Sequence, residues 1–389
     1  MKLLVLLSRF PFPLDKGDKL RAYYQLRELA RHHEICLFAL SDEPVPAEAL
    51  AAVRPLCQGG LVVRRLRRPG IARGLAWALV SGRPFQVGYF HDAGAQRQVD
   101  ELLRDFRPAQ VYCQLIRMAE YLRPHAGQLP MTLDYMDVFS AGMARRATQA
   151  PAWQRPVLAL EARRLLAYEA AAFDWFTHHT IISDQDRQLI VHPQRNSIEI
   201  VLNGIDTVFF SSQPAAAKPH DVLFCGNMSY HPNVDAACFL AEEIMPLVRR
   251  QHPTARLLVA GTTPAPRVQA LASAQVEISG WVPDIRAAYA SARIFAAPMR
   301  MGTGLQNKLL EAMAMELPCV TTPLANNALG GTDGRELHVA ADAPALAAAI
   351  ASLLGEPAAA AALARRGHAF VQQHYTWAGA TARLEALFG

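Results

Sequence analysis

The chain has 389 residues, of which 51% are hydrophobic and 19% charged, a composition typical of a globular protein large enough for two domains. No apolar run approaches the roughly 18–20 residues that span a bilayer. The sequence also lacks a basic stripe interleaved with aromatics, the pattern that would suggest nucleic-acid binding. The net charge of +5 is uneven, because basic residues outnumber acidic ones by 26 to 20 in residues 1–200, whereas residues 201–389 hold 13 against 14.

The first residues, MKLLVLLSRFPFP, are apolar enough to suggest a signal peptide. Ser8 and Arg9 interrupt the apolar run after five residues, however, so we expect a buried strand instead. The six cysteines form no CxxC pair and lie mostly in apolar segments, which indicates buried thiols in a reducing compartment. We therefore expect a cytoplasmic protein.

Strand and helix patterns alternate along the chain, which favours parallel sheets with helices on both faces. In the first half we expect strands at 2–7, 35–40, 110–113, 131–134, 180–183 and 197–202, and helices at 20–31 and 152–176. The segment SSQPAAAKPH at 211–220 is the clearest change in composition, and we interpret it as the interdomain linker. Beyond it we expect strands at 221–225, 255–260, 276–278, 293–297 and 319–321, a helix at 234–250 and a helical end at 340–389.

Candidate ligand-binding residues in the first half follow expected strands, at the edge of a parallel sheet where ligands bind. Gly17 lies in the loop after the first strand and is a candidate for close approach to a substrate. No GxGxxG pattern is present, which argues against a nicotinamide or flavin site. Asp134 and Asp137 end another strand; such aspartates bind ligands or cap the next turn, and we favour the ligand site for Asp137.

A basic cluster in the first half has two interpretations. The segment contains Arg64, Arg65, Arg67, Arg68 and Arg73, followed by the apolar residues Leu75, Trp77, Leu79 and Val80. A basic cluster beside an amphipathic stretch docks on anionic lipid headgroups in some proteins. A solvated loop followed by an ordinary surface helix is the other interpretation.

The segment APMRMGTGLQNKLLEAMAMELPCV (297–320) reads as a strand end, a glycine-rich turn, a helix from about Leu305 and a second strand. The free amides and positive dipole of a helix start favour phosphate. Lys308 and Glu311 share one helix face, and an ionised glutamate can accept two hydroxyl protons from a diol. Phosphate and ribose together would describe a nucleotide diphosphate; an ordinary amphipathic helix with a surface Lys–Glu pair is the alternative.

Five motifs in this order resemble the retaining GT-B glycosyltransferases of family 4: PFPLDKGDKLR, VLNGIDTVFF, VLFCGNMSYHPN, GWVPDI and the 297–320 segment. The resemblance covers nearly the whole chain and is strongest to the branch associated with exopolysaccharide assembly. It implies an α/β fold of two Rossmann-like, doubly wound parallel-sheet domains facing a cleft, with C-terminal helices. Residues 1–205 would bind the acceptor, with a helix at about 375–389 packing back on them, and residues 206–374 would bind the nucleotide-sugar donor.

The resemblance also assigns roles to residues of the second domain. It implies that Glu311 binds the ribose hydroxyls and that Lys308 and Arg300 neutralise the diphosphate. It further implies that Val282 packs against the base. The amides of Gly302, Thr303, Gly304 and Leu305 would face the sugar and phosphates.

Other positions match the family pattern less well. Gly17 matches the loop that closes over the phosphates, and Gly226 the glycine of the second domain's first loop. Thr303 stands where many members carry a glutamate, and Asn227 follows Gly226 where many carry cations. Asp137 occupies roughly the region of a sugar-contacting histidine, so we assign it, with Lys308 and Arg300, to catalysis.

The resemblance implies transfer of a hexose, with retention, from a nucleotide-diphosphate sugar to a lipid-linked glycan acceptor in exopolysaccharide or cell-surface polysaccharide biosynthesis. We expect no metal, no cofactor beyond the donor and no nucleic acid. We also expect a peripheral contact with anionic lipid on the inner face of the plasma membrane. A GT-B protein that binds nucleotide or glycan without transferring it is the alternative, and a sugar-nucleotide epimerase is a third.

Overall fold

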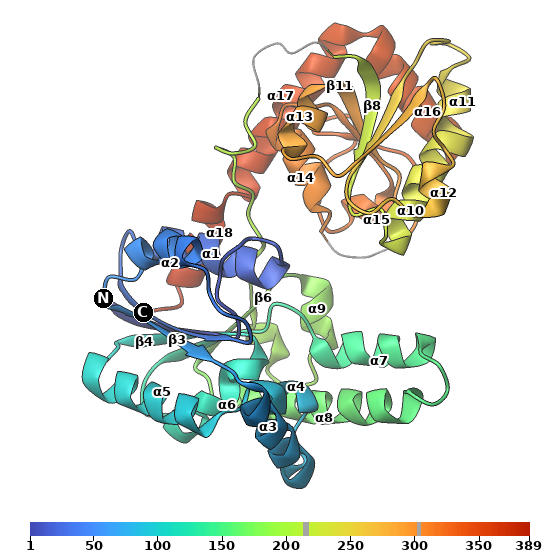
Figure 1. The fold of residues 1–389 in the computed structure, drawn as a ribbon. Helices are drawn as coiled ribbons and strands as arrows, with labels where there is room; N and C mark the ends of the chain where they lie inside the picture. Colours follow the sequence, from blue (N-terminus) through green and yellow to red (C-terminus); the bar gives the residue numbers. More distant parts are fainter. Residues whose placement is uncertain (213–217, 302–304) are drawn as a thin grey trace. The chain divides into compact units, whose positions relative to one another are not determined.

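The computed structural model describes residues 1–212, 218–301 and 305–389, which form two compact units (Figure 1). Unit 1 contains Met1–Gly204 together with Trp377–Gly389, and unit 2 contains Ile205–Thr376. Both are parallel α/β structures, as the alternating sequence pattern predicts. Each unit is described by itself below.

The described residues of unit 1 form a seven-stranded parallel sheet in the order β3-β2-β1-β4-β5-β6-β7. The inner strand β1 sends alternate side chains into two cores, Leu4 and Leu6 to one face and Leu3 and Val5 to the other. The strands are β1 (Lys2–Leu7), β2 (Glu34–Ser41), β3 (Gly60–Arg65), β4 (Gln110–Gln114), β5 (Met131–Asp134), β6 (His178–Ile181) and β7 (Glu199–Ile200).

Helices cover both faces of this sheet. The core on the Leu3 side includes side chains of α1, α2 and α18, so the last helix of the chain packs on the first unit. The helices are α1 (Gly17–Leu29), α2 (Ala47–Val53), α3 (Arg68–Ser81), α4 (Phe85–Phe90), α5 (Ala93–Phe106), α6 (Ala119–Leu122), α7 (Phe139–Gln149), α8 (Arg155–Phe173), α9 (Asp184–Leu189) and α18 (Trp377–Glu385).

Unit 2 repeats the arrangement with a parallel sheet in the order β10-β9-β8-β11-β12-β13 among its described residues. The strands are β8 (His220–Cys225), β9 (Leu257–Ala260), β10 (Val276–Gly280), β11 (Ala292–Ala297), β12 (Cys319–Thr321) and β13 (His338–Val339). The helices are α10 (His231–Phe239), α11 (Met245–Val248), α12 (Pro266–Gln269), α13 (Ile285–Ala290), α14 (Asn307–Ala314), α15 (Pro323–Asn326), α16 (Ala343–Gly355) and α17 (Pro357–His374). In both sheets the strand order reverses at the first strand, as in a doubly wound fold.

The chain passes between the units at 204–205 and 376–377, and not at the segment 211–220 that its composition suggested. Ile205 already belongs to unit 2, because its N–H donates to the Tyr375 carbonyl at 2.7 Å. The Phe209 ring lies under the Arg286 guanidinium at 4.0 Å, which anchors the following residues as well. Residues 213–217 lie outside the described residues. The predicted domain limits, 205/206 and about 375, differ from these boundaries by one or two residues.

Three further observations concern the cysteines, membrane-spanning helices and metal sites. All six cysteines are free and buried, as predicted. Within the described ranges no single helix is long and apolar enough to cross a membrane; α16 and α17 meet that test only as a pair bent by 109°. No three histidine, cysteine or acidic side chains gather into a possible metal site in the part of the chain that the structure describes.

Candidate functional site

A pocket of about 420 Å³ lies at the carboxyl edge of the unit 2 sheet. Its walls come from the residues that follow β8, β9 and β10 and from the start of α14, which is where ligands bind in doubly wound sheets. The lining residues are Cys225, Gly226, Asn227, Asn233, Gly261, Thr262, Trp281, Val282, Ile285, Leu305, Asn307, Lys308 and Glu311.

Two glycines let the backbones of this edge approach each other. Gly261 has a φ of +141°, and a Cβ there would stand 1.7 Å from the Gly226 carbonyl oxygen. Gly226 has a φ of +157°, and a Cβ there would lie 2.7 Å from the Asn233 amide nitrogen. Any side chain at either position would therefore strain the backbone and displace the loop that forms this wall.

A chain of hydrogen bonds fixes Lys308 in the pocket. The Asn233 side chain, only 5% exposed, donates from Nδ2 to the Asn227 carbonyl at 2.9 Å. Its Oδ1 accepts a hydrogen bond from Lys308 Nζ at 2.5 Å. Asn233 therefore joins the β8–α10 loop to α14 and holds the ammonium group in one place.

Glu311, one turn further along α14, is fixed by a different neutral partner. The hydroxyl of Tyr289, fully buried in α13, donates to Glu311 Oε2 at 2.7 Å and lies 2.9 Å from the Cys225 sulfur. Glu311 Oε1 has no hydrogen-bond partner among the residues that the structure describes. One carboxylate oxygen is thus held in place, while the other is left for a ligand.

Burial shifts the pKa values of both charged groups of the pocket, Lys308 and Glu311. It lowers the pKa of Lys308 below the ordinary lysine value. Burial also raises the pKa of Glu311, an effect opposed by the Tyr289 hydrogen bond and the Lys308 charge. Each group would gain from a ligand that compensates its lost hydration, an anion for the ammonium and hydroxyl donors for the carboxylate.

Most of the residues predicted for the second domain line this pocket: Gly226, Asn227, Val282, Leu305, Lys308 and Glu311. Val282 lines the pocket together with the exposed Trp281 and the half-buried Ile285, and these three side chains give it an apolar wall. The helix begins at Asn307, two residues later than expected, so Leu305 precedes it. Gly302, Thr303 and Gly304 lie outside the described residues.

Arg300 is not among the residues that line the pocket. Its guanidinium makes two hydrogen bonds to Asp235, at 3.0 and 2.7 Å, and lies 4.1 Å from the centre of the Phe239 ring. These contacts hold the loop after β11 to α10, and the role of Arg300 in neutralising a diphosphate stays a prediction.

The predicted residues of the first half lie in unit 1. Gly17 is exposed at the first position of α1, and no atom lies within 4 Å of an added Cβ, so packing within the protein does not require glycine there. Asp137 is exposed in the loop after β5, where its N–H donates to the Tyr135 carbonyl at 2.6 Å.

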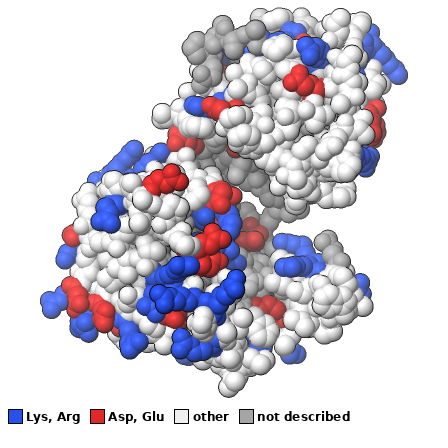
Figure 2. Space-filling view, viewed as in Figure 1, with Lys and Arg blue, Asp and Glu red and all other residues white. Residues whose placement is uncertain are grey.

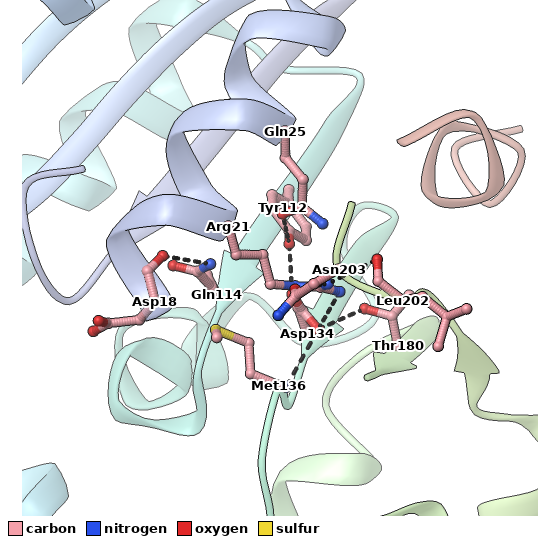
Figure 3. A network of polar contacts seen from close by, with 10 residues as sticks. All are labelled: Asp18, Arg21, Gln25, Tyr112, Gln114, Asp134, Met136, Thr180, Leu202 and Asn203. Atoms are coloured by element: carbon pink, nitrogen blue, oxygen red, sulfur yellow. Dashed lines mark hydrogen bonds and ion pairs between the residues drawn. The ribbon is translucent and has the colours of Figure 1, made fainter. Parts of the chain in front are cut away.

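Asp134, by contrast, is fully buried at the end of β5 (Figure 3). It forms an ion pair with the equally buried Arg21 at 2.6 Å and accepts hydrogen bonds from the hydroxyls of Tyr112 and Thr180 at 2.8 and 2.9 Å. Arg21 also donates to the Asn203 side chain at 2.9 Å, next to the point where the chain leaves unit 1. With its oxygens satisfied, Asp134 is a structural group that ties α1 to β5 and to this exit.

The residues that sequence reasoning missed include Asn233 and Gly261, which line the pocket, and Tyr289, which bonds to Glu311 from outside it. Asn233 could have been predicted, because it lies in the GNMSYHPN stretch and a buried polar residue in a helix needs hydrogen-bond partners. Tyr289 carries no local signal, since its bond to Glu311 joins residues 22 positions apart.

Comparisons with known proteins agree with this arrangement. Residues 219–356, most of unit 2, match the family model for group 1 glycosyl transferases. An uncharacterized 44.6 kDa protein in the cps region of Klebsiella pneumoniae is 24% identical over 164 residues, which are 40% of this chain and 42% of that protein. The match thus spans less than half the length of that relative.

Solved structures resemble the whole chain. Sucrose-phosphate synthase from Thermosynechococcus elongatus is 15% identical with a TM-score of 0.67, over 100% of this chain and 98% of that one. Anabaena HepE in complex with UDP is 12% identical with a TM-score of 0.64, over 99% of both chains; it has also been solved with UDP-glucose. The chain therefore has the GT-B glycosyltransferase fold, and most of its second unit matches the group 1 glycosyltransferase family model.

Proposed function

We propose that this protein is a glycosyltransferase whose unit 2 pocket binds a nucleotide-diphosphate sugar. The observation that carries the proposal is that Lys308 and Glu311 line one pocket, and that each is hydrogen-bonded to a neutral side chain. Both residues lie in the segment that matches the family model. In this assignment Glu311 accepts the ribose hydroxyls, Lys308 contacts the diphosphate, and Val282 with its apolar neighbours packs against the base.

We propose transfer with retention of the anomeric configuration to a glycan acceptor, lipid-linked, in exopolysaccharide or cell-surface polysaccharide synthesis. The bond between the sugar and the diphosphate breaks, the acceptor hydroxyl oxygen bonds to the same carbon on the same face, and its proton passes to the departing phosphate oxygen. Lys308 would stabilise the charge that develops on that leaving group. The resemblance of motifs and the relative from a cps region support this context.

The donor site is tested by thermal shift with a panel of nucleoside diphosphates and their sugars. One of them should raise the melting temperature selectively, since a ligand that binds only the folded state stabilises it. Lys308→Ala should reduce transfer strongly in a folded protein, and Glu311→Ala should mainly weaken nucleotide binding measured by calorimetry. A panel without any stabilising nucleotide would refute the assignment, as would near-normal turnover by Lys308→Ala.

The second candidate is a GT-B protein that binds nucleotide or glycan without transfer. One observation favours it: Lys308 is the only cation among the described lining residues, because Asn227 provides none and Arg300 is bound elsewhere. A diphosphate leaving group would then receive less charge stabilisation than the family pattern supplies. Purified protein that binds the nucleotide sugar but releases no nucleotide, with or without acceptor glycan, would establish this candidate.

We also propose a peripheral contact of unit 1 with anionic lipid at the inner face of the plasma membrane. Leu79 and Val80 are 60% and 91% exposed at the carboxyl end of α3, the helix whose first half carries Arg68 and Arg73. Trp77 is not available, because it stacks on His91 with ring centres 4.0 Å apart. Replacing Leu79 and Val80 by serine should reduce vesicle binding; unchanged binding would refute the contact.

A further inference from the structure

A second hollow, of about 670 Å³, lies in unit 1 between the end of β3 and the first turns of α3 and α5. Its charged lining consists of Arg64, Arg65, Arg67, Arg73 and one acidic residue, Asp92. An adjoining depression shares Arg64, Arg73 and Asp92 and adds Arg97. The arginines form the dense basic patch over α3 to α5 in Figure 2. We call these residues the arginine pocket.

The charges of the arginine pocket are not balanced by the protein. Arg64 pairs with Asp92 at 2.9 Å, so five arginines face one carboxylate and leave a formal charge of +4. The side chains of Arg65, Arg67 and Arg73 form no ion pair or hydrogen bond with the residues that the structure describes. Guanidinium groups gathered without anions repel one another, and this repulsion lowers the stability of the folded protein.

The side chain of Arg64 is held in place within the arginine pocket by the neighbouring helix α5. The space at Gly94, in the first turn of α5, admits its guanidinium, since a Cβ there would lie 2.4 Å from Arg64 Nη2. Arg64 Nε is buried and has no hydrogen-bond partner among the described residues. A buried donor without a partner costs free energy unless a ligand or water accepts from it.

The start of α3 adds to the positive potential. Arg67 is its N-cap residue and makes no capping hydrogen bond, and the first turn contains no acidic side chain. The residues Arg67, Pro69 and Gly70 line the pocket, so the positive end of this fourteen-residue helix opens on it. The arginine pocket thus brings together the start of α3, the arginine side chains and the Arg64 Nε donor that has no described partner.

We propose that the arginine pocket is a binding site for a ligand with clustered phosphoryl groups, such as a diphosphate. Arginine suits this chemistry because its planar guanidinium donates two parallel hydrogen bonds to phosphate oxygens. The site is separate from the nucleotide pocket, since all its residues belong to unit 1. The phosphoryl groups come either from a lipid headgroup or from a soluble phosphorylated molecule.

The test is calorimetry with inorganic pyrophosphate on the full chain carrying Lys308→Ala, which removes the cation of the unit 2 pocket. Pyrophosphate should bind, and the added pair Arg65→Ala/Arg73→Ala should weaken binding about tenfold or more, because it removes charge-assisted hydrogen bonds. Both arginines are exposed, so the folded structure should persist. The matched control is Arg104→Ala/Arg250→Ala, which removes the same charge at exposed positions outside the pocket.

Two outcomes overturn the proposal: absence of pyrophosphate binding, or equal losses in the pocket and control pairs. Because the tested chain lacks Lys308, pyrophosphate binding by the arginine pocket is measured independently of the nucleotide site proposed in unit 2. Either proposal can therefore fail without the other. The source of the ligand is read from vesicles of phosphatidylglycerol and phosphatidylcholine. Pyrophosphate that displaces the protein from these vesicles identifies a lipid headgroup, whereas pyrophosphate that binds without displacing it identifies a soluble ligand.

Discussion

Replacing Asn233 by alanine tests the geometry of the unit 2 pocket most directly. The change removes the acceptor of the Lys308 ammonium, at 2.5 Å, and the donor to the Asn227 carbonyl, at 2.9 Å. A hydrogen bond to a charged group contributes roughly 1.5–3 kcal/mol and a neutral one roughly 0.5–1.5 kcal/mol. We therefore expect the free energy of unfolding to fall by about 2–4.5 kcal/mol. Nucleotide binding should weaken as well, because Lys308 loses its fixed position.

The assay is equilibrium urea denaturation, with amide hydrogen exchange on peptides of α10 and α14 to assign the loss to unit 2. Asn307→Ala is the matched control, since Asn307 lines the same pocket but is exposed. A double-mutant cycle of Asn233→Ala with Lys308→Met should show a coupling energy of about 1.5–3 kcal/mol. Additive effects, or a loss at Asn233 no larger than at Asn307, would refute the reasoning.

Three further predictions concern Tyr289, Arg300 and His179, a buried residue of β6. Tyr289→Phe removes the hydrogen bond that opposes the burial-induced rise in the pKa of Glu311, so that pKa should rise further. On acidification, nucleotide binding followed by calorimetry should then be lost at a higher pH than in the unaltered protein; identical pH profiles would contradict this role. Arg300→Ala should leave nucleotide affinity within about twofold and cost less than about 1 kcal/mol of stability, because its pair with Asp235 is partly exposed; a tenfold loss of affinity would return Arg300 to the diphosphate. Burial lowers the pKa of His179 to about 4, so the unfolded chain binds the proton more readily and stability should fall as pH drops from about 6.5 towards 4. His179→Gln should flatten this part of the curve of unfolding free energy against pH, and an unchanged slope would argue against it.

The two sheets were predictable because parallel strands buried on both faces read as continuous apolar runs, of which Lys2–Leu7 is an example. The edge strand Gly60–Arg65 was not expected. It is only partly buried and ends in two arginines, so its sequence reads as a basic loop. The change in composition at 211–220 did not mark the chain crossing, because the bond between Ile205 and Tyr375, which ties the crossing to unit 2, joins segments far apart in sequence.

In the pocket, local spacing was sufficient to place Lys308 and Glu311 together, because residues three apart share a helix face. It did not identify what holds them. Asn233 reaches Lys308 across 75 residues, and Tyr289 reaches Glu311 across 22. Such partners depend on how α10 and α13 pack beside α14, which no periodicity in the chain encodes.

These partners also distinguish between the two interpretations of α14 that the sequence left open. A surface Lys–Glu pair would neutralise itself, yet no ion pair joins Lys308 to Glu311 among the described residues; Lys308 bonds to Asn233 and Glu311 to Tyr289. Neutral partners orient the two groups without cancelling their charges. A ligand carrying both phosphate and hydroxyl groups can therefore bind without first breaking an ion pair, and it relieves the burial that perturbs both pKa values. The arrangement is that of a site prepared for a charged ligand rather than of an ordinary amphipathic helix.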